Sequence, residues 1–199
     1  MTSIRDRVVL AALALVDEQG LEPFSTRKLG ARMGMQAMSL YHYFPNREAI
    51  LDAAVDRMIA EVSLPNVAKV GWRRGLVQLA QNYRTMGHRH LLAIPLLAQR
   101  CPSSPTMQGF LDTLLGLLLK AGLSRAAAEN WLIIQRDYVI GSLMADFSSH
   151  VLAAEQSTSG SAGANRDVNA PAAFPPKKAR EQAFAKGFNA MLDAIEREC

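Results

Sequence analysis

Residues 24–51 read FSTRKLGARMGMQAMSLYHYFPNREAIL, and this stretch decides the fold. The apolar spacing and capping residues predict two short helices, over residues 26–33 and 37–43. Gly34 lies in the tight turn between them, and Pro45 ends the second helix. Two short helices joined by such a turn form a helix-turn-helix, whose second helix enters the major groove of DNA.

Basic side chains gather in the same stretch. Residues 23–47 contain Arg27, Lys28, Arg32 and Arg47 and no Asp or Glu, although the whole chain carries a formal charge of only +4. A local positive region of this kind is typical of proteins that bind a polyanion. The alternative is an ordinary solvated basic face.

The residue types of the second short helix favour contact with DNA. Leu40 and Phe44 are the apolar positions and are expected to face inward. Their neighbours are small or hydrogen-bonding side chains, which allow close approach to base edges and phosphates. These neighbours are Ala37, Ser39, Tyr41, His42 and Tyr43.

The remainder of the chain also shows helical periodicity, and no run of alternating β-branched residues occurs. We therefore predict an all-α fold of about nine to ten helices, with a DNA-binding unit over residues 1–62 and a larger unit over residues 63–199. Beyond the two short helices, the main helices are expected near residues 4–19, 47–62, 72–86, 105–120, 125–147 and 180–197. Residues 153–178 are rich in Ala, Ser, Gly, Asn and Pro, which predicts a mobile loop.

Several functional classes are not supported by the composition. Cys101 and Cys199 are far apart, so neither a disulfide framework nor a cysteine zinc site is expected, and a reducing cytoplasm is the default location. The longest apolar stretch, residues 111–119, is too short to span a bilayer. The N-terminal residues lack the apolar run of a signal peptide, so secretion is not expected.

The stretch from Phe24 to Leu51 resembles the signature of the tetracycline-repressor (TetR) family. That signature is roughly S/T-x-x-x-L/I-A-x-x-x-G-V-x-x-x-x-L/I-Y-x-H/Y-F-x-x-K-x-x-L, and the resemblance extends over residues 4–62. The chain departs from it at Gly30 in place of alanine, Met35 in place of valine and Arg47 in place of lysine. Glycine is expected to weaken its helix by up to about 1 kcal/mol relative to alanine.

The resemblance implies a division of roles among the DNA-facing residues. It implies phosphate contacts from Thr26, Tyr41, Tyr43 and Arg47. It implies base-edge contacts from Arg27, Ala37, Met38, Ser39 and His42. Two alternatives stay open: Tyr41 packs in the core, or His42 is exposed and contacts at most a phosphate.

The second half is similar in outline to the tetracycline-repressor-like C-terminal domain. The resemblance implies a repressor that binds a palindromic double-stranded operator as a homodimer, formed through the helices near residues 125–147 and 180–197. It also implies release by a small apolar or aromatic effector, without a cofactor. Its cavity would be lined by Tyr83, Met86, His90, Phe110, Leu114, Trp131, Gln135 and Tyr138, each of which is alternatively ordinary core.

Two other functions compete with this interpretation. An enzyme could act on a small molecule in the C-terminal cavity, or the protein could bind DNA without any effector. His88 and His90 are two residues apart and do not share a helix face, and no carboxylate is spaced to complete a metal site. No catalytic or metal-binding residue is therefore predicted. Tetracycline repressors bind drug-carried magnesium with a histidine near the start of the sixth helix. Here that region, residues 91–97, contains Pro95 and no histidine, so magnesium–tetracycline recognition is not expected.

Overall fold

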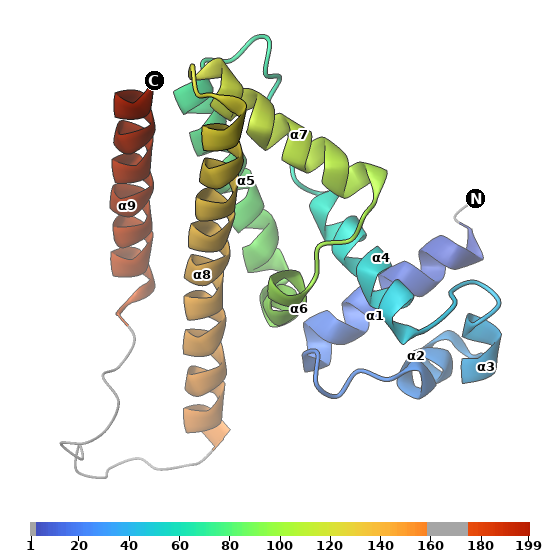
Figure 1. The fold of residues 1–199 in the computed structure, drawn as a ribbon. Coiled ribbons are helices and arrows are strands. Elements are labelled where there is room, and N and C mark those ends of the chain that lie inside the picture. Colours follow the sequence, from blue (N-terminus) through green and yellow to red (C-terminus); the bar gives the residue numbers. More distant parts are fainter. Residues whose placement is uncertain (1–2, 159–174) are drawn as a thin grey trace, which may run out of the picture.

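The structure is a computed structural model that describes residues 3–158 and 175–199, and within them it is all-α, with nine α-helices and one 3-10 turn. Figure 1 shows a small N-terminal unit beside a longer helical body. The elements are α1 (Ile4–Gln19), α2 (Thr26–Met33), α3 (Ala37–Leu40), α4 (Arg47–Ile59), α5 (Trp72–Arg89), η1 (Leu91–Ala93), α6 (Ile94–Gln99), α7 (Pro105–Lys120), α8 (Arg125–Thr158) and α9 (Lys177–Glu198).

Local capping explains where the helices of the N-terminal unit begin and end. Ser3 and Asp6 form a capping box at the start of α1, and Gly20 ends that helix with a φ of 80°. Ser25 caps α2, and the Oδ1 atom of Asn46 accepts a hydrogen bond from the backbone of α4 at 2.8 Å. These signals lie within four residues of the helix ends, so the sequence displays them directly.

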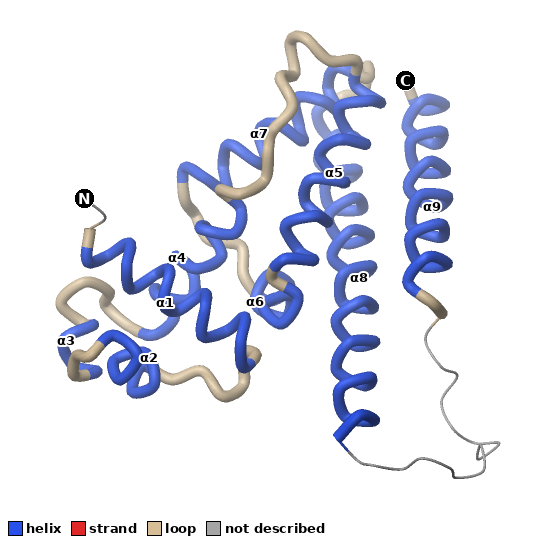
Figure 2. The backbone as a smooth tube through the Cα atoms, turned by 180° about the vertical axis from the view of Figure 1, so that it is seen from behind, coloured by secondary structure: helices blue, strands red, loops and turns tan. Residues whose placement is uncertain are grey.

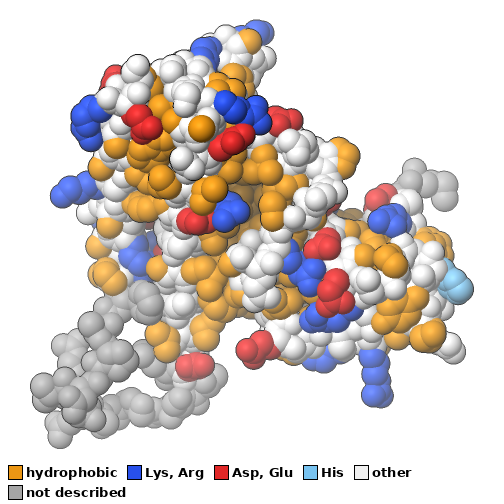
Figure 3. Space-filling model, viewed as in Figure 1, with side chains coloured by type: hydrophobic (Ala, Val, Ile, Leu, Met, Phe, Trp, Pro, Cys, Tyr) orange, Lys and Arg blue, Asp and Glu red, His pale blue; other side chains and the backbone are white. Residues whose placement is uncertain are grey.

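The body is dominated by two long helices that run antiparallel. Figures 1 and 2 both show α8 and α9 side by side along one edge of the body. Helix α5 packs on α8, and α7 extends from the end of the body where α8 begins toward the N-terminal unit. Leu117, Leu118, Leu143, Leu192 and Ile195 are fully buried among these helices. Apolar side chains also occupy much of the surface of the body (Figure 3). No helix in the described residues is long and apolar enough to cross a membrane.

The predicted end of α8 and the predicted bounds of the loop after it are wrong. Helix α8 continues to Thr158, beyond the predicted end near residue 147, because alanine and glutamate at residues 153–155 favour helix whatever they pack against. The predicted mobile loop over residues 153–178 therefore starts too early, because its first residues belong to α8. It also ends too late, because α9 begins at Lys177. The part over residues 159–174 lies outside the described residues.

Helix α3 is shorter than predicted, since it ends at Leu40 and residues 41–43 form turns. The backbone N–H of Tyr41 donates to Met38, and that of Tyr43 donates to Leu40, at 3.2 and 3.0 Å. These bonds span three residues, as in a 3-10 helix. The residue before Pro45 is biased away from helical geometry, so the chain leaves the α conformation before it reaches the proline.

Candidate nucleic-acid interface and ligand cavities

Two glycines shape the turn between α2 and α3. Gly34 has a φ of 67°, in the left-handed region that glycine adopts without steric cost, and it ends α2. A Cβ atom on Gly30 would lie 2.8 Å from the carbonyl oxygen of Met35 and 3.0 Å from the backbone nitrogen of Ala37. These are backbone atoms, which cannot rotate aside. Gly30 thus permits the close packing of α3 on α2, a role that its helix propensity does not indicate.

The side chains predicted to contact DNA lie at the start of α2, on α3 and the turns that follow it, and at the start of α4. Met38 is 72% exposed and Tyr41 is 41% exposed, whereas Leu40 and Phe44 are buried beneath them. Tyr41 is therefore not a core residue, which removes the first alternative. Arg27 and His42 are exposed, and the remaining predicted residues are partly exposed; these are Thr26, Ala37, Ser39, Tyr43 and Arg47.

The positive charge of this surface is smaller than the sequence implies. Both Nη atoms of Arg32 donate to the carboxylate of Glu18 on α1 at 2.6 Å, and this hydrogen bonding lowers the pKa of Glu18. Arg47 Nη1 lies 3.1 Å from Glu48 Oε1. Arg27 has no ion-pair partner within the described residues. Lys28 also lacks an ion-pair partner there, since its Nζ atom donates to the neutral Gln19 at 3.1 Å, so Arg27 and Lys28 keep the unpaired charges of this stretch.

One supporting residue was not predicted. The Nη1 atom of Arg5 on α1 donates to the carbonyl oxygen of Tyr43 at 2.6 Å, and its guanidinium lies over the Phe44 ring at 4.3 Å from the centroid. Arg5 thereby joins α1 to the turns after α3. The two partners are 38 residues apart, so no local pattern in the sequence indicates the contact.

Two adjoining cavities lie in the C-terminal helices. The inner cavity holds about 430 Å³ of space free of protein atoms, part of it open to solvent, and its lining residues are Leu76, Leu79, Ala80, Tyr83, Phe110, Leu111, Leu114, Gln135, Arg136, Val139 and Phe188. The outer cavity holds about 810 Å³ on the same measure, and its lining residues are Ile59, Tyr83, Leu97, Ala98, Gln99, Arg100, Cys101, Met107, Phe110, Leu111, Arg136, Asp137 and Ile140. Tyr83, Phe110, Leu111 and Arg136 line both cavities, which are therefore neighbours.

Four of the predicted ligand residues line the inner cavity: Tyr83, Phe110, Leu114 and Gln135. The rings of Tyr83 and Phe110 lie 5.3 Å apart between centroids and form part of the wall of both cavities. Burial raises the pKa of Tyr83, so its hydroxyl stays neutral and offers a hydrogen bond without a charge.

Gln135 is the polar feature of the inner cavity. Its side chain is 2% exposed, and its Nε2 atom is buried without a hydrogen-bond partner in the described part of the chain. An unsatisfied buried amide costs free energy until it finds an acceptor. A bound molecule with an oxygen acceptor at this point would supply one.

The other four predicted ligand residues lie elsewhere. Met86 is 1% exposed in the core, Trp131 donates from Nε1 to Glu198 at 2.8 Å, and the Tyr138 hydroxyl donates to the carbonyl of Phe184 at 3.0 Å. None of these three side chains lines the inner or the outer cavity. Helical spacing alone did not distinguish the cavity wall from the contacts that α8 makes with α9.

His90 also lies away from both cavities, at the junction of the two units. Its Nδ1 atom is 2.8 Å from Asp17 on α1, and its Nε2 atom is 3.1 Å from Glu61 after α4. Carboxylates on opposite sides of the ring stabilise a protonated imidazole. No group of three potential metal-ligating side chains occurs in residues 3–158 and 175–199.

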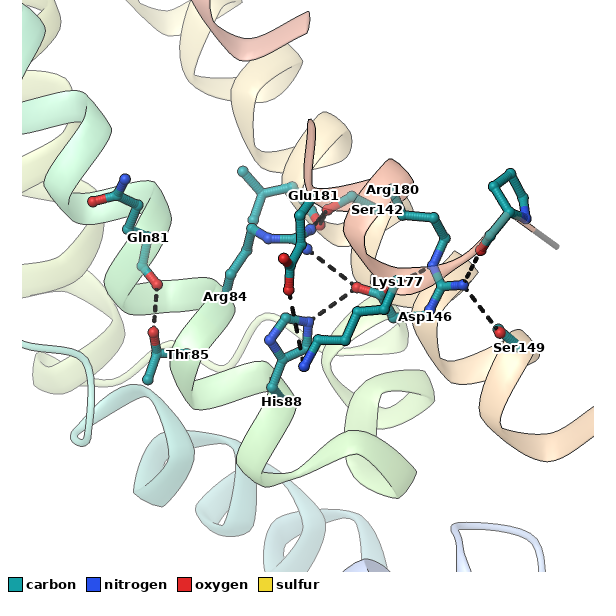
Figure 4. A network of polar contacts seen from close by, with 12 residues as sticks. Gln81, Arg84, Thr85, His88, Ser142, Asp146, Ser149, Lys177, Arg180 and Glu181 are labelled. Carbon is teal, nitrogen blue, oxygen red and sulfur yellow. Dashed lines mark hydrogen bonds and ion pairs between the residues drawn. The ribbon is translucent and has the colours of Figure 1, made fainter. Parts of the chain in front are cut away.

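A buried charged network joins α5, α8 and α9 (Figure 4). Arg84 and Asp146 are each 7% exposed and lie 3.2 Å apart, while His88 and Arg180 approach the same carboxylate at 3.0 and 2.7 Å. Burial raises the pKa of Asp146, but hydrogen bonds from His88 and Arg180 and the two arginine charges outweigh it, so the pKa is lowered. No local pattern in the sequence indicates this network, because its partners come from three distant segments.

Comparison with known protein families gives two matches that together cover most of the chain. The model described as bacterial regulatory proteins, tetR family, matches residues 8–54. The model of the tetracyclin repressor-like C-terminal domain matches residues 64–198.

Individual proteins are similar as well. The tetracycline repressor protein class A from transposon 1721 of Escherichia coli is 32% identical over 147 residues, which is 72% of this chain and 68% of that protein. Among solved structures, a TetR variant from Acinetobacter baumannii AYE in complex with minocycline is 27% identical, with a TM-score of 0.74 and coverage of 96% and 95%. A possible TetR family regulator from Streptomyces coelicolor A3(2) shares the fold with a TM-score of 0.80, at 24% identity and coverage of 97% and 98%.

Proposed function

Because this chain belongs to the TetR family of bacterial regulatory proteins, we propose that it is a repressor that binds a palindromic operator as a homodimer and is released by a small molecule. In this proposal residues 1–62 contact DNA, and residues 63–199 dimerise and hold the effector. The family is one of transcriptional regulators and not of enzymes.

One observation carries the DNA-binding proposal. Helix α3 and the turns after it present exposed Met38, Tyr41 and His42, while Leu40 and Phe44 fix the opposite side in the core. A helix held in this way can enter the major groove without losing its own packing. The proposed base-edge contacts come from Arg27, Ala37, Met38, Ser39 and His42, and the proposed phosphate contacts from Thr26, Tyr41, Tyr43 and Arg47.

The dimer proposal is supported by apolar residues on the outer surface of α8. Ile133 and Ile134 are 50% and 45% exposed, and Leu152 is 43% exposed. A second copy of α8 and α9 related by a two-fold axis would cover such a surface. The same axis would place two copies of α3 on half-sites about 34–36 Å apart, or a multiple of that distance.

The effector proposal is supported by the inner cavity. Its lining is apolar apart from Gln135 and Arg136, which suits a small apolar or aromatic molecule with an oxygen acceptor for the Gln135 amide. A related repressor in a solved structure is in complex with minocycline. In this chain His88 and His90 pair with carboxylates outside the cavities, so no histidine is available there for a metal carried by such a drug.

Selection of bound sequences from a random pool of double-stranded DNA tests the proposal. We expect an inverted repeat with half-sites one helical turn or a multiple apart, and binding that weakens steeply with salt. Sedimentation of the complex should give two chains per site. Recovery of no common sequence, or binding by a single chain to an unrepeated site, would contradict it.

A further inference from the structure

The loop between α6 and α7 lies against a row of acidic residues on α4. Glu48, Asp52 and Asp56 are spaced four residues apart, which places them along one side of that helix. Arg100 Nη1 lies 2.7 Å from Asp52 Oδ1, and the Ser104 hydroxyl donates to Asp56 Oδ1 at 2.5 Å. Acidic and basic side chains are visible next to one another at this junction in Figure 3. Residues 100–104, which form this loop, therefore connect the body to α4 through an ion pair and a hydrogen bond.

The same loop forms a wall of the outer cavity. Arg100 and Cys101 line that cavity together with Tyr83 and Phe110, which it shares with the inner cavity. The side chain of Arg100 is only 19% exposed, whereas its partner Asp52 is 42% exposed. A cation of the outer cavity wall is thus paired with a carboxylate that remains in contact with water.

Beyond α4 the contacts continue to the DNA-facing surface. Glu48 Oε1 lies 3.8 Å from Arg100 Nη2 and 3.1 Å from Arg47 Nη1. The Glu48 carboxylate therefore lies between a residue of the cavity wall and a residue assigned to a phosphate contact. A change in the partners of Arg100 reaches Arg47 through one side chain.

We propose that the outer cavity accepts the acidic group of an anionic, largely apolar effector, and that this group pairs with Arg100 in place of Asp52. This inference rests on the proposed repressor function and names the chemical class of its effector. The apolar part would fill the inner cavity, and a carboxylate, sulfonate or phenolate would reach Arg100. Guanidinium binds such planar or multidentate anions through paired N–H groups.

Competition for Arg100 explains how occupancy would reach α4. Asp52 is 42% exposed, so its attraction to Arg100 is screened by water, and an anion bound beside the less exposed guanidinium can compete with it. Loss of the Arg100–Asp52 pair would remove one of the contacts that hold the first half of α4, which carries Arg47. Because effector and α4 use the same guanidinium, each must weaken the other to the same extent. The other cation of this wall, Arg136, is paired with the adjacent Asp137 at 2.8 Å and has no ion pair with α4.

Two dyes with the same rings separate the charge from the apolar contact. The probes are 8-anilinonaphthalene-1-sulfonate and the neutral N-phenyl-1-naphthylamine, both of which fluoresce in apolar sites. Arg100→Gln should weaken binding of the sulfonate about tenfold and change the neutral dye less than twofold. Asp52→Asn removes the competitor and should strengthen sulfonate binding several-fold, which a merely structural role of Arg100 would not produce.

The control is Arg136→Gln, which removes the second cation of the same wall. It should weaken sulfonate binding clearly less than Arg100→Gln does. A saturating concentration of the sulfonate dye should lower the affinity of the wild-type protein for its selected DNA. The same concentration should leave the DNA affinity of the Arg100→Gln variant unchanged. Equal losses in both arginine variants, equal losses for both dyes, or weaker sulfonate binding by Asp52→Asn would overturn the proposal. The dye titrations contain no DNA, so failure of operator binding would be seen separately.

Discussion

The imidazole of His90 lies 2.8 Å from Asp17, so the end of α5 is joined to α1 by a hydrogen-bonded pair. Glu61 contacts the other ring nitrogen at 3.1 Å, and Arg57 and Arg89 each lie 3.8 Å from that carboxylate. The hydrogen bond to Asp17 is the main reason why the pKa of His90 is raised; burial opposes it and Glu61 adds to it.

This pair predicts a pH dependence of stability. A raised pKa means that the protonated ring stabilises the folded state fully below the unfolded pKa, near 6.5, and that this stabilisation is lost as the pH rises through the folded value. Urea unfolding of wild type and His90→Gln should therefore differ more at pH 6 than at pH 9. An equal difference at both pH values would show that the ring is not protonated in the folded protein.

Asp146→Asn should be strongly destabilising. The change leaves Arg84 buried without a negative partner, which costs about 3–5 kcal/mol of the free energy of unfolding. Asp193→Asn is the matched control, since it removes an exposed partner of Arg73 and should cost less than about 1 kcal/mol. Urea unfolding measures both values. Similar losses in the two variants would mean that the network of Figure 4 is no stronger than a surface ion pair.

Gln135→Leu should stabilise the protein without ligand. Leucine removes the buried Nε2 donor that has no partner in the described residues, and an unmade hydrogen bond of this kind costs about 1–3 kcal/mol. Thermal unfolding should show a higher Tm for Gln135→Leu than for wild type. A lower Tm would indicate that the amide is already satisfied.

Gly30→Ala should destabilise the protein by about 1–3 kcal/mol, although alanine favours helix, because its Cβ would meet the backbone at Met35 and Ala37. Gly109→Ala in α7 is the control, since no heavy atom lies within 4 Å of the added Cβ. That variant should gain up to about 1 kcal/mol. If Gly30→Ala were also stabilised in urea unfolding, the close approach of α2 and α3 would not constrain residue 30.

The sequence was sufficient for the helix-turn-helix because its signals are local. The cap at Ser25, the turn at Gly34 and the inward positions of Leu40 and Phe44 are all within a few residues of the elements they define. The all-α class and the exposed side of α3 followed from the same patterns. The predicted end of α8 near residue 147 and the predicted loop from residue 153 are wrong, because the change in composition at residue 153 does not interrupt the helix, which continues to Thr158.

The ligand region was less predictable for a physical reason. The amphipathic pattern of α8 identifies buried positions but not which helix covers each one, so Gln135 lines a cavity while Tyr138 packs on α9. Contacts such as Arg5 with Tyr43 and Arg84 with Asp146 join residues 38 and 62 positions apart. Such pairs depend on the tertiary arrangement, which spacing along one helix does not encode.

The side chains of α3 and the turn after it are proposed to determine which DNA sequence is bound. Arg47 is proposed to contact a phosphate of the DNA backbone. Affinities of wild type, His42→Ala, Ser39→Ala and Arg47→Ala for the selected operator and its single-base variants, over a range of salt, test this most directly. We predict that His42→Ala or Ser39→Ala changes the preferred base at a defined position. Arg47→Ala should weaken binding to all sequences and reduce the salt slope by about 1. A changed base preference in Arg47→Ala, with none in Ser39→Ala or His42→Ala, would contradict the account.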